Sequence, residues 1–235
     1  MQGSGGEETQ GTKVVLFDGD DTLWSTEELY DEARSAARDI VAAAGLDGDE
    51  WEQLERTLDV ANVAGLGFSP QRFPASCVQA YEQQCESHGV PLQPAITSKI
   101  WDAARTVFER HPPIKIGARE TLSALRARGI RLALLTKGHP EVQERRIEHS
   151  GLRQYFDLVH IVAEKSPQAI LDMVTALGGD PGNSWMVGNS VRSDVLPALK
   201  AGLHAIWIDA HVWEYERAHD DLVDHRVATA SRHSG

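Results

Sequence analysis

The chain has 235 residues, which allows one large domain or a core with a smaller insertion. Hydrophobic residues make up 41% and charged residues 25%, so a wholly disordered or low-complexity chain is excluded. The formal net charge of −12, with no basic run to offset it, argues against a nucleic-acid partner. Because the sequence shows neither a membrane-length apolar stretch nor the apolar core of a secretion signal, we expect a cytoplasmic protein without a membrane partner.

The first half of the chain is predicted to contain one strand followed by helices only. Residues 1–12 are Gly-rich and polar and are expected to form a flexible tail, and the apolar run 13–17 predicts a buried strand. Ser25 and Glu28 have capping-box spacing, which marks the start of a helical stretch that continues to residue 111. The expected helices cover residues 25–44, 50–61, 70–88 and 94–110.

From Pro112 onward, helical and strand patterns alternate, as in parallel βαβ units. The sequence therefore predicts an α/β fold, a Rossmann-like doubly wound parallel sheet formed by residues 13–23 and 112–210, with an all-helical insertion at 24–111. The polar, weakly patterned segment 211–235 is expected to be partly flexible. The predicted strands are 130–135, 158–162, 185–187 and 203–208, and the predicted helices are 119–128, 139–150, 166–177 and 193–200.

Polar residues follow the first four of the five predicted strands, and in a doubly wound sheet ligands bind beyond these strand ends. The first strand is followed by Asp18 and Asp20, and a later strand by the segment 188–194, which ends in Asp194. Between them come Thr136-Lys137-Gly138 and Lys165. We therefore expect several carboxylates, one or two lysines and small residues at one edge of the sheet.

These residue types suit phosphoryl transfer. Three converging carboxylates repel each other unless a cation joins them, and an all-oxygen ligand set suits Mg²⁺. A carboxylate that attacks phosphorus forms an aspartyl-phosphate, and a second carboxylate two residues on protonates the leaving oxygen and then activates water. The Thr136 hydroxyl and the backbone N–H groups after Thr136 or Gly19 are candidate phosphate ligands.

The ordered set of residues resembles the motifs of the haloacid dehalogenase-like (HAD) hydrolases, over about residues 13–208. The family's first motif, DxDx(T/V), is matched by Asp18, Asp20 and Thr22, and its later motifs by Thr136, by Lys165 and by the acidic segment that begins at Gly188. The helical insertion is similar to the α-helical cap of that family.

The resemblance implies a Mg²⁺-dependent phosphatase that acts on a small phosphorylated substrate, as a monomer or homodimer. Asp20 favours phosphoryl chemistry, because true dehalogenases of the family lack the second aspartate. The implied catalytic residues are Asp18 as nucleophile, Asp20 as general acid and base, and Thr136 and Lys165 as stabilising groups. The expected metal ligands are Asp18, Asp20, Asp194 and Asn189, and the expected substrate-binding residues are Thr22, Trp24, Lys137 and Gly138.

Two residues depart from the family pattern. Asn189 stands where many members have an acidic residue, so it binds a metal directly, binds it through water, or serves only as a turn residue. Asp21 stands where many members have glycine, and the sequence assigns it no role.

Three alternatives remain open at this stage. A phosphomutase on the same scaffold passes the phosphoryl group to a sugar instead of water. A phosphonate hydrolase of this family needs a cap lysine, for which Lys99 is the one candidate in residues 24–111. A binding or regulatory member with weak catalysis is the third alternative, and Asn189 is its best support. The sequence does not identify the substrate.

Overall fold

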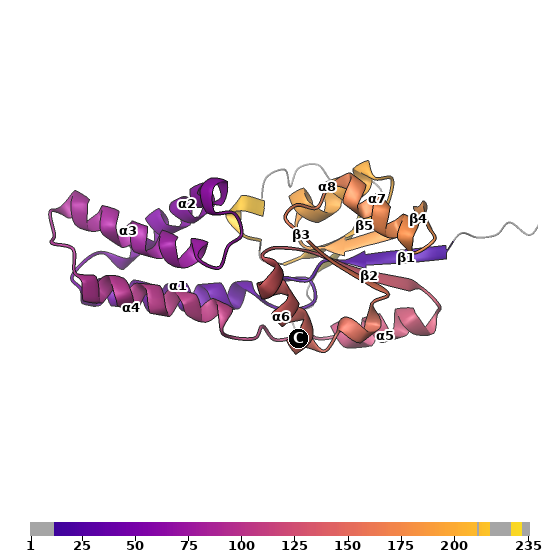
Figure 1. The fold of residues 1–235 in the computed structure, drawn as a ribbon, viewed down its shortest axis with the longest axis horizontal. Helices are drawn as coiled ribbons and strands as arrows, with labels where there is room; N and C mark the ends of the chain where they lie inside the picture. Colours follow the sequence, from indigo (N-terminus) through magenta and orange to yellow (C-terminus); the bar gives the residue numbers. More distant parts are fainter. Residues whose placement is uncertain (1–11, 211, 217–226, 232–235) are drawn as a thin grey trace, which may run out of the picture.

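The core of the protein is a six-stranded parallel sheet, and the helical insertion extends from it to give an elongated molecule (Figure 1). The computed structural model describes residues 12–210, 212–216 and 227–231. The strand order is β3-β2-β1-β4-β5-β6. The strands are β1 (Thr12–Phe17), β2 (Arg131–Lys137), β3 (Leu158–Val162), β4 (Gly179–Gly188), β5 (His204–Asp209) and β6 (Val227–Ser231).

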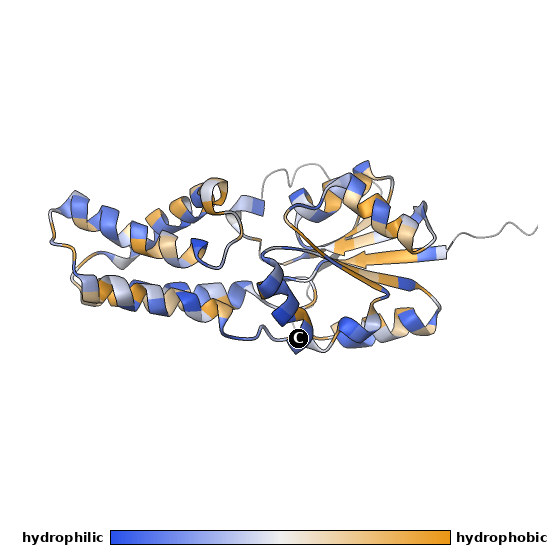
Figure 2. Cartoon of the chain, in the orientation of Figure 1, coloured by the Kyte–Doolittle hydropathy of each residue, from blue (hydrophilic) through white to orange (hydrophobic). Residues whose placement is uncertain are grey.

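Helices cover both faces of the sheet. Successive residues of a strand point to opposite faces, so each strand contacts both layers of helices. In β1, Val14 and Leu16 pack toward α7 and α8, whereas Val15 and Phe17 pack toward α5 and α6. The inner residues of the central strands are accordingly apolar, which Figure 2 shows as mainly orange ribbons with blue at some strand ends. The helices are α5 (Ala118–Ala127), α6 (Pro140–Ser150), α7 (Pro167–Ala176) and α8 (Leu196–Lys200).

The order of the strands determines where ligands can bind. The chain runs outward from β1 through β2 to β3 and then returns to place β4 on the other side of β1. The carboxyl ends of β1 and β4 therefore form a topological switch point, where open α/β sheets bind ligands. The backbone N–H of Asp18 donates to the carbonyl of Val187 at 2.9 Å, which joins the two strand ends.

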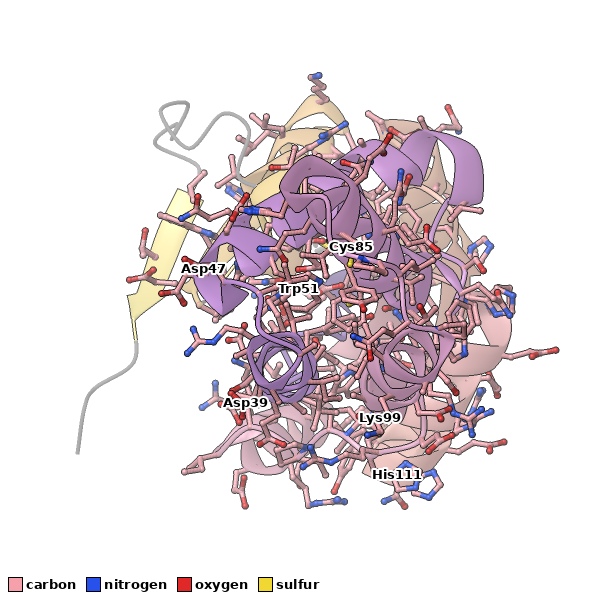
Figure 3. The ribbon with its side chains drawn as sticks, turned by 90° about the vertical axis from the view of Figure 1, so that its left-hand side faces the viewer. Asp39, Asp47, Trp51, Cys85, Lys99 and His111 are labelled. Carbon is pink, nitrogen blue, oxygen red and sulfur yellow. The ribbon has the colours of Figure 1, made fainter. Side chains whose placement is uncertain are left out.

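The inserted helices have an apolar core of their own. They are α1 (Glu27–Ala43), α2 (Gly48–Leu66), α3 (Arg72–His88), α4 (Pro94–Arg105) and a short 3₁₀ turn, η1 (Thr106–Phe108). Trp51 and Cys85 lie between the helices and are almost fully buried, whereas Lys99 projects outward (Figure 3). The insertion thus packs as a unit separate from the sheet.

The two segments that connect the sheet to the insertion lie side by side. The backbone N–H of Ser25 donates to the carbonyl of Pro113, and that of Lys115 donates to the carbonyl of Leu23, both at 2.9 Å. Both connections therefore leave the core beside the end of β1, next to the switch point.

Asp21, to which the sequence assigned no role, caps helix α1. Its Oδ1 accepts hydrogen bonds from the backbone N–H groups of Thr26 (3.0 Å) and Glu27 (3.2 Å). The predicted capping box at Ser25 and Glu28 is wrong, because the helix begins at Glu27 and its N-terminus is satisfied by this earlier carboxylate. Asp21 has φ +57°, a left-handed conformation that Asp and Asn tolerate better than most residues.

In the C-terminal half, one predicted helix cap is confirmed and one segment differs from the prediction. Ser166 caps α7 as predicted, since its Oγ accepts from the N–H of Ala169 at 3.1 Å. The weakly patterned segment 211–235 gave no strand prediction, yet residues 227–231 form β6, which pairs in parallel with β5. Of the expected tail at 1–12, Thr12 belongs to β1, and residues 1–11 lie outside the described residues, as do 211, 217–226 and 232–235.

In the part of the chain that the structure describes, no helix combines the length and the apolar character that crossing a membrane requires.

The capping role of Asp21 gives a stability prediction. Asp21→Ala removes two helix-capping hydrogen bonds and places alanine at a positive φ, so we expect the free energy of unfolding to fall by about 1–2 kcal/mol. Asp21→Asn keeps an acceptor oxygen and tolerates the same φ, and should lose half of that or less. Urea unfolding monitored by circular dichroism measures both changes, and equal losses in the two variants would contradict the capping role.

Candidate active site

Three charged side chains from three strand ends converge at the switch point. Asp18 follows β1, Lys165 follows β3 and Asp194 follows β4. The Nζ of Lys165 donates to Oδ1 of Asp18 and, at 2.6 Å, to Oδ1 of Asp194. All three are at most 5% exposed. Residues predicted from separate motifs are therefore held together in one hydrogen-bonded group.

The burial of Asp18 changes its acidity. Removal from water disfavours the carboxylate, and this effect raises the pKa of Asp18 to about 7 despite the opposing ammonium of Lys165. The negative charge of Asp194 contributes to this raised pKa. Asp18 therefore changes its protonation state near neutral pH when no other cation is beside it.

Lys165 responds to the same surroundings in the other direction. Burial alone lowers the pKa of a lysine, but here the carboxylates of Asp18 and Asp194 outweigh it and hold the pKa of Lys165 well above its usual range. Lys165 is thus a fixed positive charge beside Asp18 and Asp194.

Asp194 lies directly against the end of β4. Its Oδ2 accepts from the backbone N–H of Ser190 at 3.0 Å. A Cβ at Gly188 would lie 2.3 Å from the carboxyl carbon of Asp194, so this close approach requires glycine. Asp194 belongs to η3 (Val191–Val195), a π-helical turn of the kind that often occurs at functional sites.

Asp20 lines a cavity that Asp18, Lys165 and Asp194 also line, but its side chain has different hydrogen-bond partners. Its Oδ1 accepts from Nε1 of Trp24 at 2.6 Å. Its Oδ2 accepts from Nη1 of Arg146 at 2.7 Å and from Nε2 of Gln143 at 2.8 Å. Gln143 and Arg146 cannot be recognised as site residues from the sequence, because they resemble ordinary polar residues of a surface helix.

Trp24 does not take the substrate-binding position expected of it. Its side chain is fully buried beneath the Asp18–Thr22 loop, where a Cβ at Gly19 would lie 2.5 Å from its ring. It does not line the cavity. Its contribution here is to pack under the loop and to donate a hydrogen bond to Asp20.

Thr136 and Thr22 are buried beside the strand ends. The hydroxyl of Thr136 is fully buried and has no hydrogen-bond partner in the structure, although buried polar groups are usually paired. The hydroxyl of Thr22 donates to Oδ1 of Asn189 at 3.4 Å. Asn189 itself lines the cavity, whereas the two threonines lie behind its wall.

Of the two residues that follow Thr136, Lys137 lines the cavity and Gly138 does not. Lys137 lines the cavity and donates to Ser193 at 2.8 Å and to Glu216. Gly138 has φ +148° and faces Gln143, and a Cβ added at this glycine would lie 2.8 Å from Nε2 of that residue. Gly138 is thus required by packing, and it does not line the cavity.

Glu216 is a further site residue that the sequence did not single out. It follows β5 and accepts hydrogen bonds from Lys137 and from the hydroxyls of Ser190 (2.6 Å) and Ser193 (2.5 Å). Burial alone would raise its pKa, but these donors hold the pKa of Glu216 below its usual value. It lies in the segment after 210, whose weak pattern gave no signal of a role.

A cavity of about 150 Å³ lies between the insertion and the core. From the insertion, Arg72 lines it, paired with Asp59 and stacked with its guanidinium carbon 4.5 Å from the Trp213 ring centroid. Seven acidic and five basic side chains line this cavity. A phosphate dianion entering it would meet an excess of negative charge unless a further cation accompanied it.

The donor set at the switch point suits such a cation. Within the residues that the structure describes, no three His, Cys, Asp or Glu side chains are grouped so as to hold a metal ion. Mg²⁺, however, needs only one or two protein carboxylates and takes its other ligands from carbonyls, water and phosphate. Asp18 and Asp194 share a single ammonium group and are buried together, so the residues present fit Mg²⁺.

Comparisons with known proteins agree with this geometry. The profile of the haloacid dehalogenase-like hydrolases matches residues 12–202. Glyceraldehyde 3-phosphate phosphatase from Methanothermobacter thermautotrophicus is 27% identical over 88% of this chain and 90% of its own. Pyrimidine 5′-nucleotidase from Escherichia coli is 37% identical over 40% of this chain and 44% of its own.

A solved structure shows the same arrangement over nearly the whole chain. A haloacid dehalogenase-like family hydrolase from Xanthomonas campestris superposes with a TM-score of 0.72 at 27% identity, covering 93% of this chain and 90% of that one. The chain belongs to the haloacid dehalogenase-like hydrolase family.

Proposed function

We propose that this hydrolase is a Mg²⁺-dependent phosphatase that hydrolyses a small phosphomonoester through an aspartyl-phosphate on Asp18. The observation that carries the proposal is the buried Asp18 at the switch point, joined through Lys165 to Asp194. The phosphatase and nucleotidase relatives support the same reaction class. A cytoplasmic location, expected from the sequence, belongs to this proposal.

In the first step, an oxygen of Asp18 forms a bond to phosphorus and the bond from phosphorus to the leaving alcohol breaks. Asp20 gives its proton to the leaving oxygen. Lys165 offsets the charge of the Asp18 carboxylate. The Thr136 hydroxyl has no hydrogen-bond partner but lies behind the cavity wall, so its proposed role as a donor to a phosphoryl oxygen requires the wall to open when substrate binds. The product is phospho-Asp18 and a free alcohol.

In the second step, Asp20, now ionised, takes a proton from water, and the water oxygen attacks phosphorus. The bond between phosphorus and the Asp18 oxygen breaks, which releases inorganic phosphate and restores the Asp18 carboxylate. Asp20 thus returns to its protonated state, and no external reactant other than water is consumed.

We propose that Mg²⁺ is held by four groups: the side chains of Asp18, Asp194 and Asn189, and the backbone carbonyl of Asp20. When bound, Mg²⁺ supplies positive charge that offsets the phosphoryl oxygens and the carboxylates. Asn189 lines the cavity, and its Oδ1, the atom that would bind the metal directly or through water, accepts from the Thr22 hydroxyl at 3.4 Å.

The size of the cavity limits the substrate class. A volume of about 150 Å³, lying between the sheet and the inserted helices, suits a small organic phosphate better than a phosphorylated macromolecule. We propose that residues 24–111 act as the cap over this site, with residues 13–23 and 112–210 as the catalytic core.

The structure counts against one alternative reaction. A phosphonate hydrolase would need a cap lysine at the substrate, yet Lys99 is exposed on the outer side of α4 and does not line the cavity (Figure 3). The phosphomutase and the non-catalytic alternative are distinguished by product analysis, since only a phosphatase releases inorganic phosphate.

The nucleophile is tested by Asp18→Asn, which keeps the shape of the side chain but removes its nucleophilic oxygen. We expect hydrolysis of p-nitrophenyl phosphate with Mg²⁺ to fall by about 10³-fold or more, with thermal unfolding little changed. Asp39→Asn, an exposed change on α1, serves as the matched control and should keep full activity. Full activity in Asp18→Asn would exclude the proposed nucleophile.

The raised pKa of Asp18 predicts pH-dependent metal binding. Below about pH 7 Asp18 is protonated, so Mg²⁺ binding must displace a proton. Calorimetric titration of the wild type with Mg²⁺ should show an affinity that falls about tenfold per pH unit below 7 and levels off above it. In Asp18→Asn the affinity should be weak and lack this slope. A wild-type affinity that stays constant from pH 5.5 to about 8.5 would contradict the assignment.

A further inference from the structure

We infer that Arg146 and Gln143, two side chains of α6, are positioning residues that hold Asp20 for proton transfer in both steps. This inference rests on the proposed function, in which Asp20 is the general acid and base. It adds to that function two residues outside the motifs that identify the site.

The hydrogen bonds to Asp20 fix both of its carboxylate oxygens. Arg146 and Gln143 donate to Oδ2 at 2.7 and 2.8 Å, and Trp24 donates to Oδ1 at 2.6 Å. A carboxylate has about four acceptor sites, so three donors leave about one direction for a substrate or water. The donors come from two different parts of the chain and therefore restrict the rotation of the side chain.

Helix α6 presents both donors on one face, because residues three apart in a helix are neighbours. Gln143 also donates to the carbonyl of Lys137 at 2.6 Å, so its amide joins Asp20 to the end of β2. Gly138 is needed here, since a Cβ at that position would lie 2.8 Å from Nε2 of Gln143. The turn after β2 is thus shaped around the amide that holds Asp20.

The burial of these donors indicates a role beyond surface solubility. Gln143 is 2% and Arg146 is 7% exposed, whereas the Asp20 side chain is 27% exposed and lines the cavity. Asp20 therefore presents its accessible side to the cavity and is held from behind. An arginine buried at this depth has a high desolvation cost, which its pairing with Asp20 offsets.

The role predicts a specific kinetic signature. Proton donation matters most when the leaving alcohol is a poor leaving group, whereas p-nitrophenolate leaves without it. A residue that acts through Asp20 must therefore show a defect that grows as the leaving group becomes poorer. A merely structural residue would reduce the rate by the same factor for every substrate.

The test uses the full-length protein with Mg²⁺ and a series of para-substituted phenyl phosphates. For Arg146→Ala and Gln143→Glu we expect kcat/KM for p-methoxyphenyl phosphate to fall by about 10- to 100-fold, and for p-nitrophenyl phosphate by much less. Arg146→Lys keeps a positive donor and should recover part of the loss. Arg153→Ala, which removes an exposed ion pair with Glu144, is the matched control and should change neither rate more than about twofold.

A double-mutant cycle tests whether Arg146 acts through Asp20. When Asp20→Asn is already present, adding Arg146→Ala should cost less than about threefold, because the function that it supports is gone. The inference would be overturned if the rate of the double variant fell by the product of the two single-variant factors. It would also be overturned if the loss of rate were equal for all leaving groups. If Arg146→Ala does not fold, Arg146→Lys and Gln143→Glu carry the same comparison.

Failure of this inference differs from failure of the proposed function. A wild type that hydrolyses none of these phosphates, or an Asp18→Asn variant that keeps its activity, would overturn the proposed function and the inference with it. An active wild type with an inactive Asp18→Asn variant, together with defects in Arg146 and Gln143 variants that do not depend on the leaving group, would overturn the inference alone.

Discussion

Two buried carboxylates share one buried ammonium group at the centre of this protein. Asp18 and Asp194 both contact Lys165, and each is placed by the end of a different strand. Buried charges are stable only when they are paired and hydrogen-bonded, so the strand order, the glycine at 188 and the turn after β4 must all hold this group together. Burial, with a smaller contribution from the negative charge of Asp194, raises the pKa of Asp18, and the excess of negative charge in the site accounts for its fit to a divalent cation.

A second set of hydrogen-bonded side chains surrounds Asp20, which lines the same cavity as the first. Its donors come from Trp24, which packs under the first loop, and from α6. Asp21, the next residue, turns the other way and caps α1, the first helix of the insertion. Adjacent aspartates therefore serve the candidate site and the attachment of the helical insertion, which links the position of the insertion to the loop that carries Asp18, the proposed nucleophile.

Most of the core was predictable from the sequence because its signals are local. Apolar runs gave the first five strands, and Ser166 with Pro167 gave the start of α7. The residues at the strand ends were predictable as a group, since parallel strands bring their carboxyl ends to one edge. Asp18, Lys165 and Asp194 meet there as expected.

What the sequence could not show depends on contacts between distant residues. Arg146 and Gln143 look like surface residues of a helix until α6 is placed beside the first loop. Glu216 and β6 lie in a segment without hydrophobic alternation, and only the neighbouring β5 and Lys137 give them a place. Trp24 was expected at the substrate because of its position in the sequence, but burial beneath Gly19 gives it a packing role.

The central claim is that the phosphoryl group is transferred to Asp18. The most direct measurement is mass spectrometry of an Asp20→Asn variant, in which the second step is slowed, after brief reaction with p-nitrophenyl phosphate and Mg²⁺ and an acid quench. The account predicts one added phosphoryl group, located by peptide mapping on the segment that contains Asp18 and removed by hydroxylamine. A phosphoryl group on any other residue, or inorganic phosphate released with no labelled protein at any time, would contradict it.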